Sequence, residues 1–371
     1  MLQQCCSREN PLNADGSTLA NIRLNSWTPE LLKKLIENTS SLKTRKMTKE
    51  DLRIVFMGTP EFAVGTLSAL VEGGYRVVAV ITQPDKPVGR HGSVLQPSEV
   101  KRYALEKGIP VLQPEKMKDP LFIEQLRAYQ ADLQVVVAFR MLPEVVWAMP
   151  RLGTFNVHAA LLPQYRGAAP INWAVINGET TTGVTTFFLD HDIDTGRVIL
   201  RRTFDIPDDA DVEYVYDGLM RLGAEAAIDT IDRIIEGDGQ VESISQEEMM
   251  KGVTTLHPAP KIFKDTCRID WTMTSKRVYD FVRGLSPYPG AWTTLCQEGA
   301  QPIVMKVLKT SKTDRQPVGE PGEIMVEKNQ LFVTTADSLL RIDELQVAGK
   351  RRMTASDFLN GMRQAGACVL K

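Results

Sequence analysis

The chain has 371 residues, of which 43% are hydrophobic and 24% are charged. This length allows two or three domains, and the composition is that of an ordinary folded protein. The 44 basic and 46 acidic residues nearly cancel, so the overall charge does not indicate a polyanion as partner.

The five cysteines are scattered along the chain and form no pair of CxxC motifs. This spacing favours neither a disulfide framework nor a structural zinc site, and it indicates a reducing, cytoplasmic setting. The sequence has no apolar run of about 18 residues, and no apolar segment of a signal peptide follows MLQQCCSREN. We therefore expect neither a membrane span nor secretion.

Residues 1–50 are polar and irregular, apart from the amphipathic stretch PELLKKLIENTSSL. We expect a poorly ordered extension there. Two explanations stay open for residues 1–46: sequence upstream of a true start at Met47, or a genuine tail.

From Leu52 onward, apolar strands alternate with helices. The predicted strands span 52–57, 75–82, 131–139 and 154–158, and the predicted helices span 61–74 and 97–108. Continuous apolar strands separated by helices are typical of a parallel sheet covered on both faces. Residues 183–190 and 197–206 are expected to pair antiparallel, before a long amphipathic helix over 211–237.

The composition changes near residue 253. Residues 254–266 contain prolines and show no clear period, which predicts a linker. One helix is predicted over 275–285, and short β-like segments then recur up to residue 346. Regularly spaced short strands favour a small barrel. Residues 267–371 carry 15 basic and 11 acidic residues, a mild surplus that favours a polyanion partner for this part.

The stretch FNVH ends one of the predicted strands. Residues two apart on a strand face the same side, so Asn156 and His158 project together. An amide and an imidazole side by side are able to stabilise a developing oxyanion and pass a proton. A capping Asn and a hydrogen-bonded core His explain the pair equally well, and the two explanations stay open.

LDHDIDTG (189–196) places three aspartates and a histidine in one loop. The pattern lacks the glycine and glutamate of a calcium-binding EF-hand. An aspartate beside His158 would instead orient the ring and raise its pKa, although on pattern alone a solvated turn is the simpler interpretation. The turn at Gly58 lacks the dinucleotide-binding fingerprint, and no Walker A or G-x-S-x-G motif occurs.

Several segments closely resemble methionyl-tRNA formyltransferases: FMGTPEFAV, TQPDKPVGR, NVHAALLPQYRGAAPINWAVINGE, DIDTG, RIDW, LSPYPGAW and AGK. The resemblance runs from about Leu52 to the C-terminus. It implies a Rossmann-like formyltransferase domain over 51–253, the linker, and an oligonucleotide-binding-type (OB-like) barrel over 267–371 that helps to hold tRNA. The implied reaction moves a formyl group from 10-formyltetrahydrofolate to the amine of initiator methionyl-tRNA, in a cytoplasmic, monomeric enzyme without a metal.

By position, the resemblance assigns catalysis to Asn156, His158 and Asp194. It also implies two groups of functional residues. The folate contacts are Phe139, Arg140, Met141, Ala160, Leu161, Leu162 and Pro163, and the tRNA contacts are Lys86 and Arg90. Ala160 departs from the family, which usually has a serine there, so one hydroxyl is missing from the folate-contacting loop.

Two alternatives share these motifs. A formyltransferase acting on a small amine, such as glycinamide ribonucleotide or an amino sugar nucleotide, would have the same trio of residues. It would not obviously need the C-terminal 105 residues or the TQPDKPVGR loop. An inactive folate- or RNA-binding module is disfavoured by the intact trio, although Ala160 slightly favours it.

Overall fold

The computed structural model describes residues 46–88, 94–297, 299–361 and 368–371. The chain divides into two compact units, Met1–Lys46 and Met47–Lys371. The expected N-terminal extension lies outside the described residues up to position 45. The account that follows concerns the second unit.

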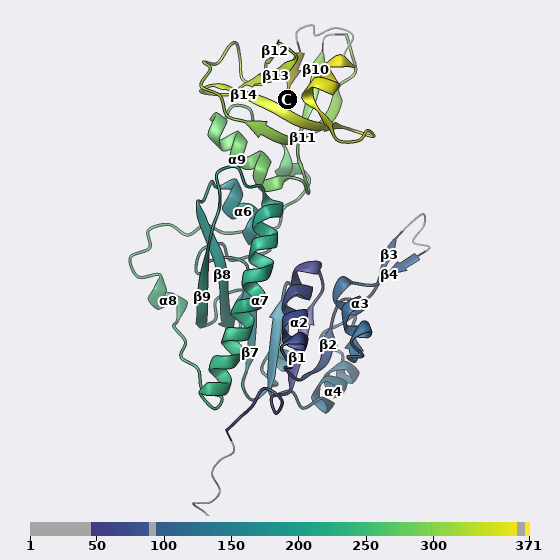
Figure 1. Cartoon of the computed structure of the whole chain (residues 1–371), viewed down its shortest axis with the longest axis vertical. Helices are drawn as coiled ribbons and strands as arrows, with labels where there is room; N and C mark the ends of the chain where they lie inside the picture. Colours follow the sequence, from purple (N-terminus) through teal and green to yellow (C-terminus); the bar gives the residue numbers. More distant parts are fainter. Residues whose placement is uncertain (1–45, 89–93, 298, 362–367) are drawn as a thin grey trace, which may run out of the picture. The chain divides into compact units, whose positions relative to one another are not determined.

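The first part of this unit is built on one seven-stranded sheet, with strand order β5-β2-β1-β6-β7-β8-β9 (Figure 1). Its strands are β1 (Ile54–Gly58), β2 (Val77–Ile81), β5 (Val111–Leu112), β6 (Leu133–Val137), β7 (Thr154–His158), β8 (Thr181–Phe188) and β9 (Val198–Asp205). The first five strands in the order run parallel, and β8 and β9 are antiparallel to their neighbours. The predicted parallel sheet with an antiparallel pair is confirmed.

Helices follow most of these strands. They are α2 (Glu61–Glu72), α3 (Glu99–Glu106), α4 (Pro120–Ala128), α5 (Glu144–Trp147), α6 (Pro170–Ile176), α7 (Val212–Glu236) and α8 (Gln246–Met249). The long helix α7 begins where the Asp211 carboxylate accepts a hydrogen bond from the backbone N–H of Tyr214, a side-chain cap that satisfies one free donor of the first turn.

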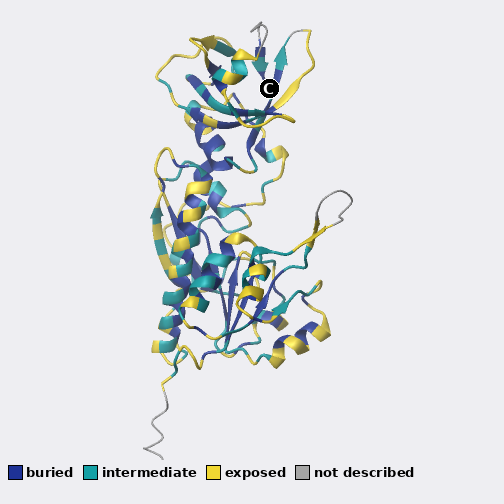
Figure 2. Ribbon diagram, turned by 45° about the vertical axis from the view of Figure 1, so that its right-hand side comes forward, coloured by how far each residue is buried: buried dark blue, intermediate teal, exposed yellow. Residues whose placement is uncertain are grey.

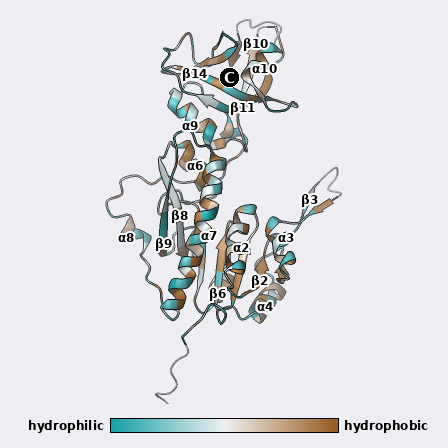
Figure 3. Ribbon diagram, viewed as in Figure 1, coloured by the Kyte–Doolittle hydropathy of each residue, from teal (hydrophilic) through white to brown (hydrophobic). Residues whose placement is uncertain are grey.

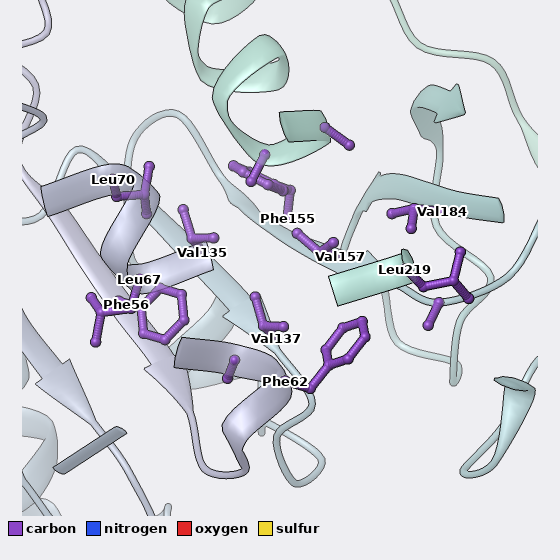
Figure 4. Packing of buried hydrophobic residues seen from close by; sticks show 14 of the residues in the cluster. Phe56, Phe62, Leu67, Leu70, Val135, Val137, Phe155, Val157, Val184 and Leu219 are labelled. Atoms are coloured by element: carbon purple, nitrogen blue, oxygen red, sulfur yellow. The ribbon is translucent and has the colours of Figure 1, made fainter. Parts of the chain in front are cut away.

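Strand alternation covers both faces of the sheet with apolar side chains. On one face, Phe56, Val135 and Phe155 pack against α2 and α7 (Figure 4). On the other, Met57 and Val136 belong to a second cluster with side chains of α4 and α5. The central strands are accordingly buried and hydrophobic (Figures 2 and 3). Continuous burial explains their near-continuous apolar sequence.

The C-terminal part is an antiparallel, nearly closed barrel with strand order β12-β13-β14-β11-β10-β16. Its elements are α9 (Ser275–Leu285), β10 (Ala291–Gln297), β11 (Ile303–Ser311), β12 (Ile324–Glu327), β13 (Gln330–Thr334), β14 (Leu339–Val347), β15 (Met353–Thr354), α10 (Ala355–Asn360) and β16 (Cys368–Leu370), after a 3-10 turn at Asp265–Cys267. The Leu370 N–H donates a hydrogen bond to the Gly322 carbonyl at 2.8 Å, which links the two ends of the sheet order. The predicted barrel is confirmed.

Some elements differ from the sequence-based expectation. The segment after Thr82 was predicted as a loop, but β3 (Lys86–Val88) pairs antiparallel with β4 (Val94–Gln96). The elements β5, α4, α5, α8, β15, α10 and β16 were not predicted. All are short, and the short strands form only through pairing with distant segments, which local periodicity does not report.

Candidate functional site

The carboxyl ends of β1, β6 and β7 meet at one edge of the sheet, because these strands are parallel neighbours. Ligands of open α/β sheets bind at such an edge. Asn156 pairs in register with Val136, and His158 is the last residue of β7. Both side chains therefore leave the strand on the face opposite Phe155, next to the loops that follow β6 and β7.

His158 is buried, and protein groups face both of its ring nitrogens. Nε2 lies 2.9 Å from the carbonyl oxygen of Tyr165; because a carbonyl only accepts, this nitrogen carries the hydrogen. Nδ1 lies 3.9 Å from Oδ2 of Asp194. The Phe187 ring meets the imidazole edge-on. The ring is thus fixed between the Tyr165 carbonyl and the Asp194 carboxylate.

Asp194 belongs to the loop between β8 and β9. Its backbone has a φ of 55°, a left-handed conformation that is uncommon for residues other than glycine. The carboxylate accepts a hydrogen bond of 3.0 Å from the Gly167 N–H. Of the three aspartates in the loop, the structure brings this one to His158, while Asp190 and Asp192 are exposed.

The Asn156 side chain makes no hydrogen bond with any other described residue. Its Oδ1 atom is buried and has no partner. A buried amide oxygen without a partner is destabilising, which makes Asn156 a candidate for binding a ligand.

The loop after β7 is held by Thr185. The Thr185 hydroxyl donates to the Ala160 carbonyl at 2.6 Å, and the Leu162 N–H donates to the Thr185 oxygen at 3.0 Å. The side chains of Ala160 and Leu162 are fully buried and Pro163 is buried as well, whereas Leu161 is partly exposed. The Thr185 hydroxyl therefore holds the conformation of this loop, and no hydroxyl at position 160 is needed for it.

The segment after β6 turns sharply at Ala138, whose φ is 46°. Arg140 donates to the carbonyls of Pro114 and Glu115, and burial lowers the pKa of its guanidinium. Phe139 is partly buried beneath this guanidinium, and Met141 is 71% exposed. Arg140 thus anchors the neighbouring loop, while Met141 is available to a ligand.

Of the two predicted tRNA contacts, Lys86 is exposed on β3, and Arg90 lies outside the described residues. The base of this hairpin is anchored at Asp85. Its carboxylate accepts hydrogen bonds from Lys101 and Gln113, each at 2.7 Å, and the first of these lowers the Asp85 pKa most. Lys86 is therefore presented from a fixed base.

Three residues that sequence reasoning missed contact the trio. Tyr165 holds His158 through its carbonyl, Gly167 holds the Asp194 carboxylate, and Gln246 donates to the Asp194 carbonyl at 2.9 Å. Tyr165 and Gly167 lie within the segment NVHAALLPQYRGAAPINWAVINGE that resembles the family, so the resemblance could have indicated them. The sequence offers no signal for Gln246, which lies far along the chain. In the described ranges, no group of three or more His, Cys, Asp and Glu is arranged to hold a metal ion. None of the described helices is long and apolar enough to cross a membrane.

The family models that match this chain are Formyl transferase over residues 52–231 and Formyl transferase, C-terminal domain, over 261–363. Together they cover most of the chain, which therefore belongs to the formyltransferase family, a family of enzymes. The match includes both the sheet that carries the candidate site and the C-terminal barrel.

Relatives named methionyl-tRNA formyltransferase specify the branch of the family. The protein of Parabacteroides distasonis is 61% identical over 319 residues, which cover 86% of this chain and 98% of the relative. That of Bacteroides fragilis is 57% identical over 326 residues, and that of Porphyromonas gingivalis 49% over 317 residues, covering 99% and 97% of those proteins. The resemblance to methionyl-tRNA formyltransferases is confirmed.

Solved structures at lower identity share the fold. HypX from Aquifex aeolicus matches with a TM-score of 0.55 and 19% identity, over 83% of this chain and 47% of that chain, so this chain spans about half of HypX. WlaRD, a sugar 3N-formyl transferase, matches with a TM-score of 0.55 and 18% identity over 81% of this chain and 99% of that chain. At these identities the likeness concerns the fold alone.

Proposed function

We propose that this enzyme transfers the formyl group of 10-formyltetrahydrofolate to the α-amine of initiator methionyl-tRNA, giving formylmethionyl-tRNA for the start of translation. Relatives that carry the name of this activity are 49–61% identical over nearly their whole length. The observation that carries the mechanism is the unpaired Asn156 amide beside the His158–Asp194 pair. Because initiator tRNA belongs to the translation machinery, we propose a cytoplasmic location. We also propose that the enzyme acts as a monomer.

The reaction needs an oxyanion site and a route for protons. The methionyl amine attacks the formyl carbon, and negative charge grows on the formyl oxygen. The Asn156 amide and protonated His158 stabilise that oxygen, a role in which one donor is typically worth about 10²–10³ in rate. The bond from the formyl carbon to N10 of the folate then breaks, N10 gains a proton, and the attacking amine loses one.

Asp194 supports the proton transfers. Its carboxylate lies 3.9 Å from Nδ1, where it orients the imidazole for these transfers. The Tyr165 carbonyl, 2.9 Å from Nε2, holds the other side of the ring. Protonated His158 then gives a proton to the leaving N10 and, once neutral, accepts the proton that the attacking amine loses.

The folate is proposed to bind between the two loops that flank β6 and β7. On the first, Met141 and Phe139 present side chains, and Arg140 fixes the segment. On the second, Leu161 and the backbone from Ala160 to Pro163 form the contact, because the other side chains of that loop are buried. This places the formyl carbon at the carboxyl end of β7.

The tRNA is proposed to contact both the hairpin with Lys86 and Arg90 and the C-terminal domain. We propose residues 51–253 as the catalytic domain, 254–266 as the linker and 267–371 as the tRNA-binding domain. The latter carries 15 basic and 11 acidic residues. Lys350 and Arg351 are exposed there and form no ion pair with other described residues, which leaves both free for phosphate.

A formylation assay with three acceptors tests this function. Purified enzyme is supplied with 10-formyltetrahydrofolate and either charged initiator tRNA, glycinamide ribonucleotide or an amino sugar nucleotide. We expect formylation of the methionyl-tRNA alone. Formylation of a small amine with the tRNA untouched would favour a small-molecule enzyme, and no transfer to any acceptor would favour a binding module.

A further inference from the structure

Gln246 is a buried glutamine that connects two loops of the candidate site. It is 2% exposed and is the first residue of the short helix α8. Its Nε2 donates to the carbonyls of Asp194 and Gly196, both at 2.9 Å. Its Oε1 accepts from Nε and Nη2 of Arg166, at 3.0 and 2.7 Å.

These four contacts use the whole hydrogen-bonding capacity of the amide. A primary amide has two N–H donors and an oxygen with two acceptor sites, and here each one has a partner. A carboxylate would face two carbonyl oxygens without a proton to donate. An apolar side chain would leave two carbonyls and one guanidinium unpaired, which is costly in a buried setting.

The position of Gln246 is set by the preceding residues. Ile244 and Val198 exchange two backbone hydrogen bonds of 2.8 Å, so the segment before α8 runs antiparallel along the start of β9. Arg197 adds contacts to Ser243, and the Ser245 hydroxyl caps α8. The amide is thereby held next to the loop that leads into β9, which is the loop that carries Asp194.

The two loops meet again at the carboxylate. Arg166 is followed by Gly167, whose N–H donates to Oδ2 of Asp194. The Asp194 loop is therefore held twice: at its carboxylate by Gly167 and at its carbonyl by Gln246. Asp194 has a left-handed backbone, a conformation that is uncommon for a residue other than glycine and that neighbouring contacts help to hold.

We propose that Gln246 is a positioning residue for the formyl transfer. By bridging Arg166 to the Asp194 and Gly196 carbonyls, it fixes the carboxylate of Asp194 relative to His158. This inference rests on the proposed function, since it assigns Gln246 an effect only through Asp194. Gln246 itself touches no reacting atom.

A double-mutant cycle tests the inference. Gln246→Met keeps the length of the side chain and removes the four hydrogen bonds. The matched control is Gln134→Met on β6, a glutamine that is fully buried but has only one hydrogen bond, from Thr154, and an unpaired Nε2. Both substitutions are made in the wild-type and Asp194→Asn backgrounds, and the single-turnover rate and thermal midpoint are measured at saturating methionyl-tRNA and 10-formyltetrahydrofolate.

We expect Gln246→Met to lower the wild-type rate by about 10- to 100-fold, the scale of a misplaced catalytic group. In the Asp194→Asn background it should change the rate by less than about twofold, because the group that it positions is gone. Gln134→Met should leave the rate unchanged in both backgrounds. If Gln246→Met does not fold, Gln246→Glu replaces it, since this variant keeps the Arg166 contact and loses both donors.

Two results would overturn the inference and are distinguishable from failure of the proposed function. An equal loss of rate in both backgrounds would mean that Gln246 acts independently of Asp194. An unchanged rate with Gln246→Met, together with a slow Asp194→Asn enzyme, would remove Gln246 from the mechanism and leave the role of Asp194 intact. A wild-type rate for Asp194→Asn would instead contradict the proposed mechanism itself.

Discussion

His158 Nδ1 and Asp194 Oδ2 lie 3.9 Å apart, although helix α6 and strand β8 separate the two residues in the chain. The antiparallel pairing of β7 with β8 places the end of β8 beside the start of β7, so the loop after β8 has to return toward the end of β7. The Gly167 N–H, which binds the Asp194 carboxylate, and the left-handed backbone of Asp194 accompany this return. The position of the carboxylate next to His158 therefore depends on tertiary structure and not on proximity in the sequence.

Asp194→Asn should slow formyl transfer. The amide oxygen of asparagine still accepts the Gly167 N–H, so the loop should keep its shape, but the negative charge beside His158 is lost. General acid–base assistance is typically worth about 10²–10⁴ in rate, and we expect a fall at the lower end of that range in single-turnover formylation. The exposed neighbour Asp192, changed to Asn, is the control and should react at the wild-type rate. An equally slow Asp192→Asn enzyme would indicate a general effect of loop charge.

Ala160→Ser should not increase activity, although it restores the hydroxyl that the family usually has. Ala160 is fully buried in the apolar cluster, so the added oxygen would not reach a ligand. A buried hydroxyl without a partner costs about 1–3 kcal/mol, and the free energy of unfolding should fall accordingly. Formylation kinetics and urea unfolding measure the two effects. A large gain in the rate or in folate affinity would show that the loop opens to the ligand.

Gly167→Ala should reduce both stability and activity. Gly167 has a φ of 130°, and a Cβ atom there would lie 2.4 Å from the Ala259 carbonyl oxygen. The matched control is Gly252→Ala, at a φ of 86° with no atom within 4 Å of its Cβ position, which isolates backbone strain of about 1–2 kcal/mol. Thermal unfolding should show the larger loss for Gly167→Ala. Equal losses would mean that the contact with Ala259 relaxes freely.

Replacing Lys350 and Arg351 together by Gln should weaken tRNA binding and reduce its salt dependence. If each residue neutralises one phosphate, the slope of log K against log salt concentration should change by about two units. Arg352→Gln is the control, because Arg352 is already paired with Glu344 and should contribute less. Filter binding of methionyl-tRNA over a salt series measures the slopes. An unchanged slope for the double variant would place the phosphate contacts elsewhere.

Much of the fold was predictable from local patterns. β7 ends at His158 as predicted, and α9 spans the predicted residues, because its apolar spacing and the Thr274 cap are both encoded locally. The two-faced burial of β1 and β6 follows from their continuous apolar sequence. In contrast, β5 has two residues and β16 has three, and each exists only through pairing with a distant strand.

The candidate site was predictable only in part. The common face of Asn156 and His158 follows from strand alternation. The pattern of residues 189–196 alone did not indicate that Asp194 approaches His158, because a solvated turn explained it more simply. Gln246 was not predictable, since its role arises from side-chain contacts with residues that lie far earlier in the chain. The positive φ of Tyr165 likewise has no local signature in a tyrosine.

Single-turnover formylation of initiator methionyl-tRNA by the Asn156→Ala and His158→Ala variants, alongside wild-type enzyme, tests the central claim most directly. The account predicts that the wild-type enzyme forms formylmethionyl-tRNA and that each variant is slower by about 10²–10³. The thermal midpoint should change little for Asn156→Ala and should fall for His158→Ala, because that variant removes a buried ring and leaves the Tyr165 carbonyl unpaired. Near-wild-type rates in both variants would contradict the assignment of the reaction to this site.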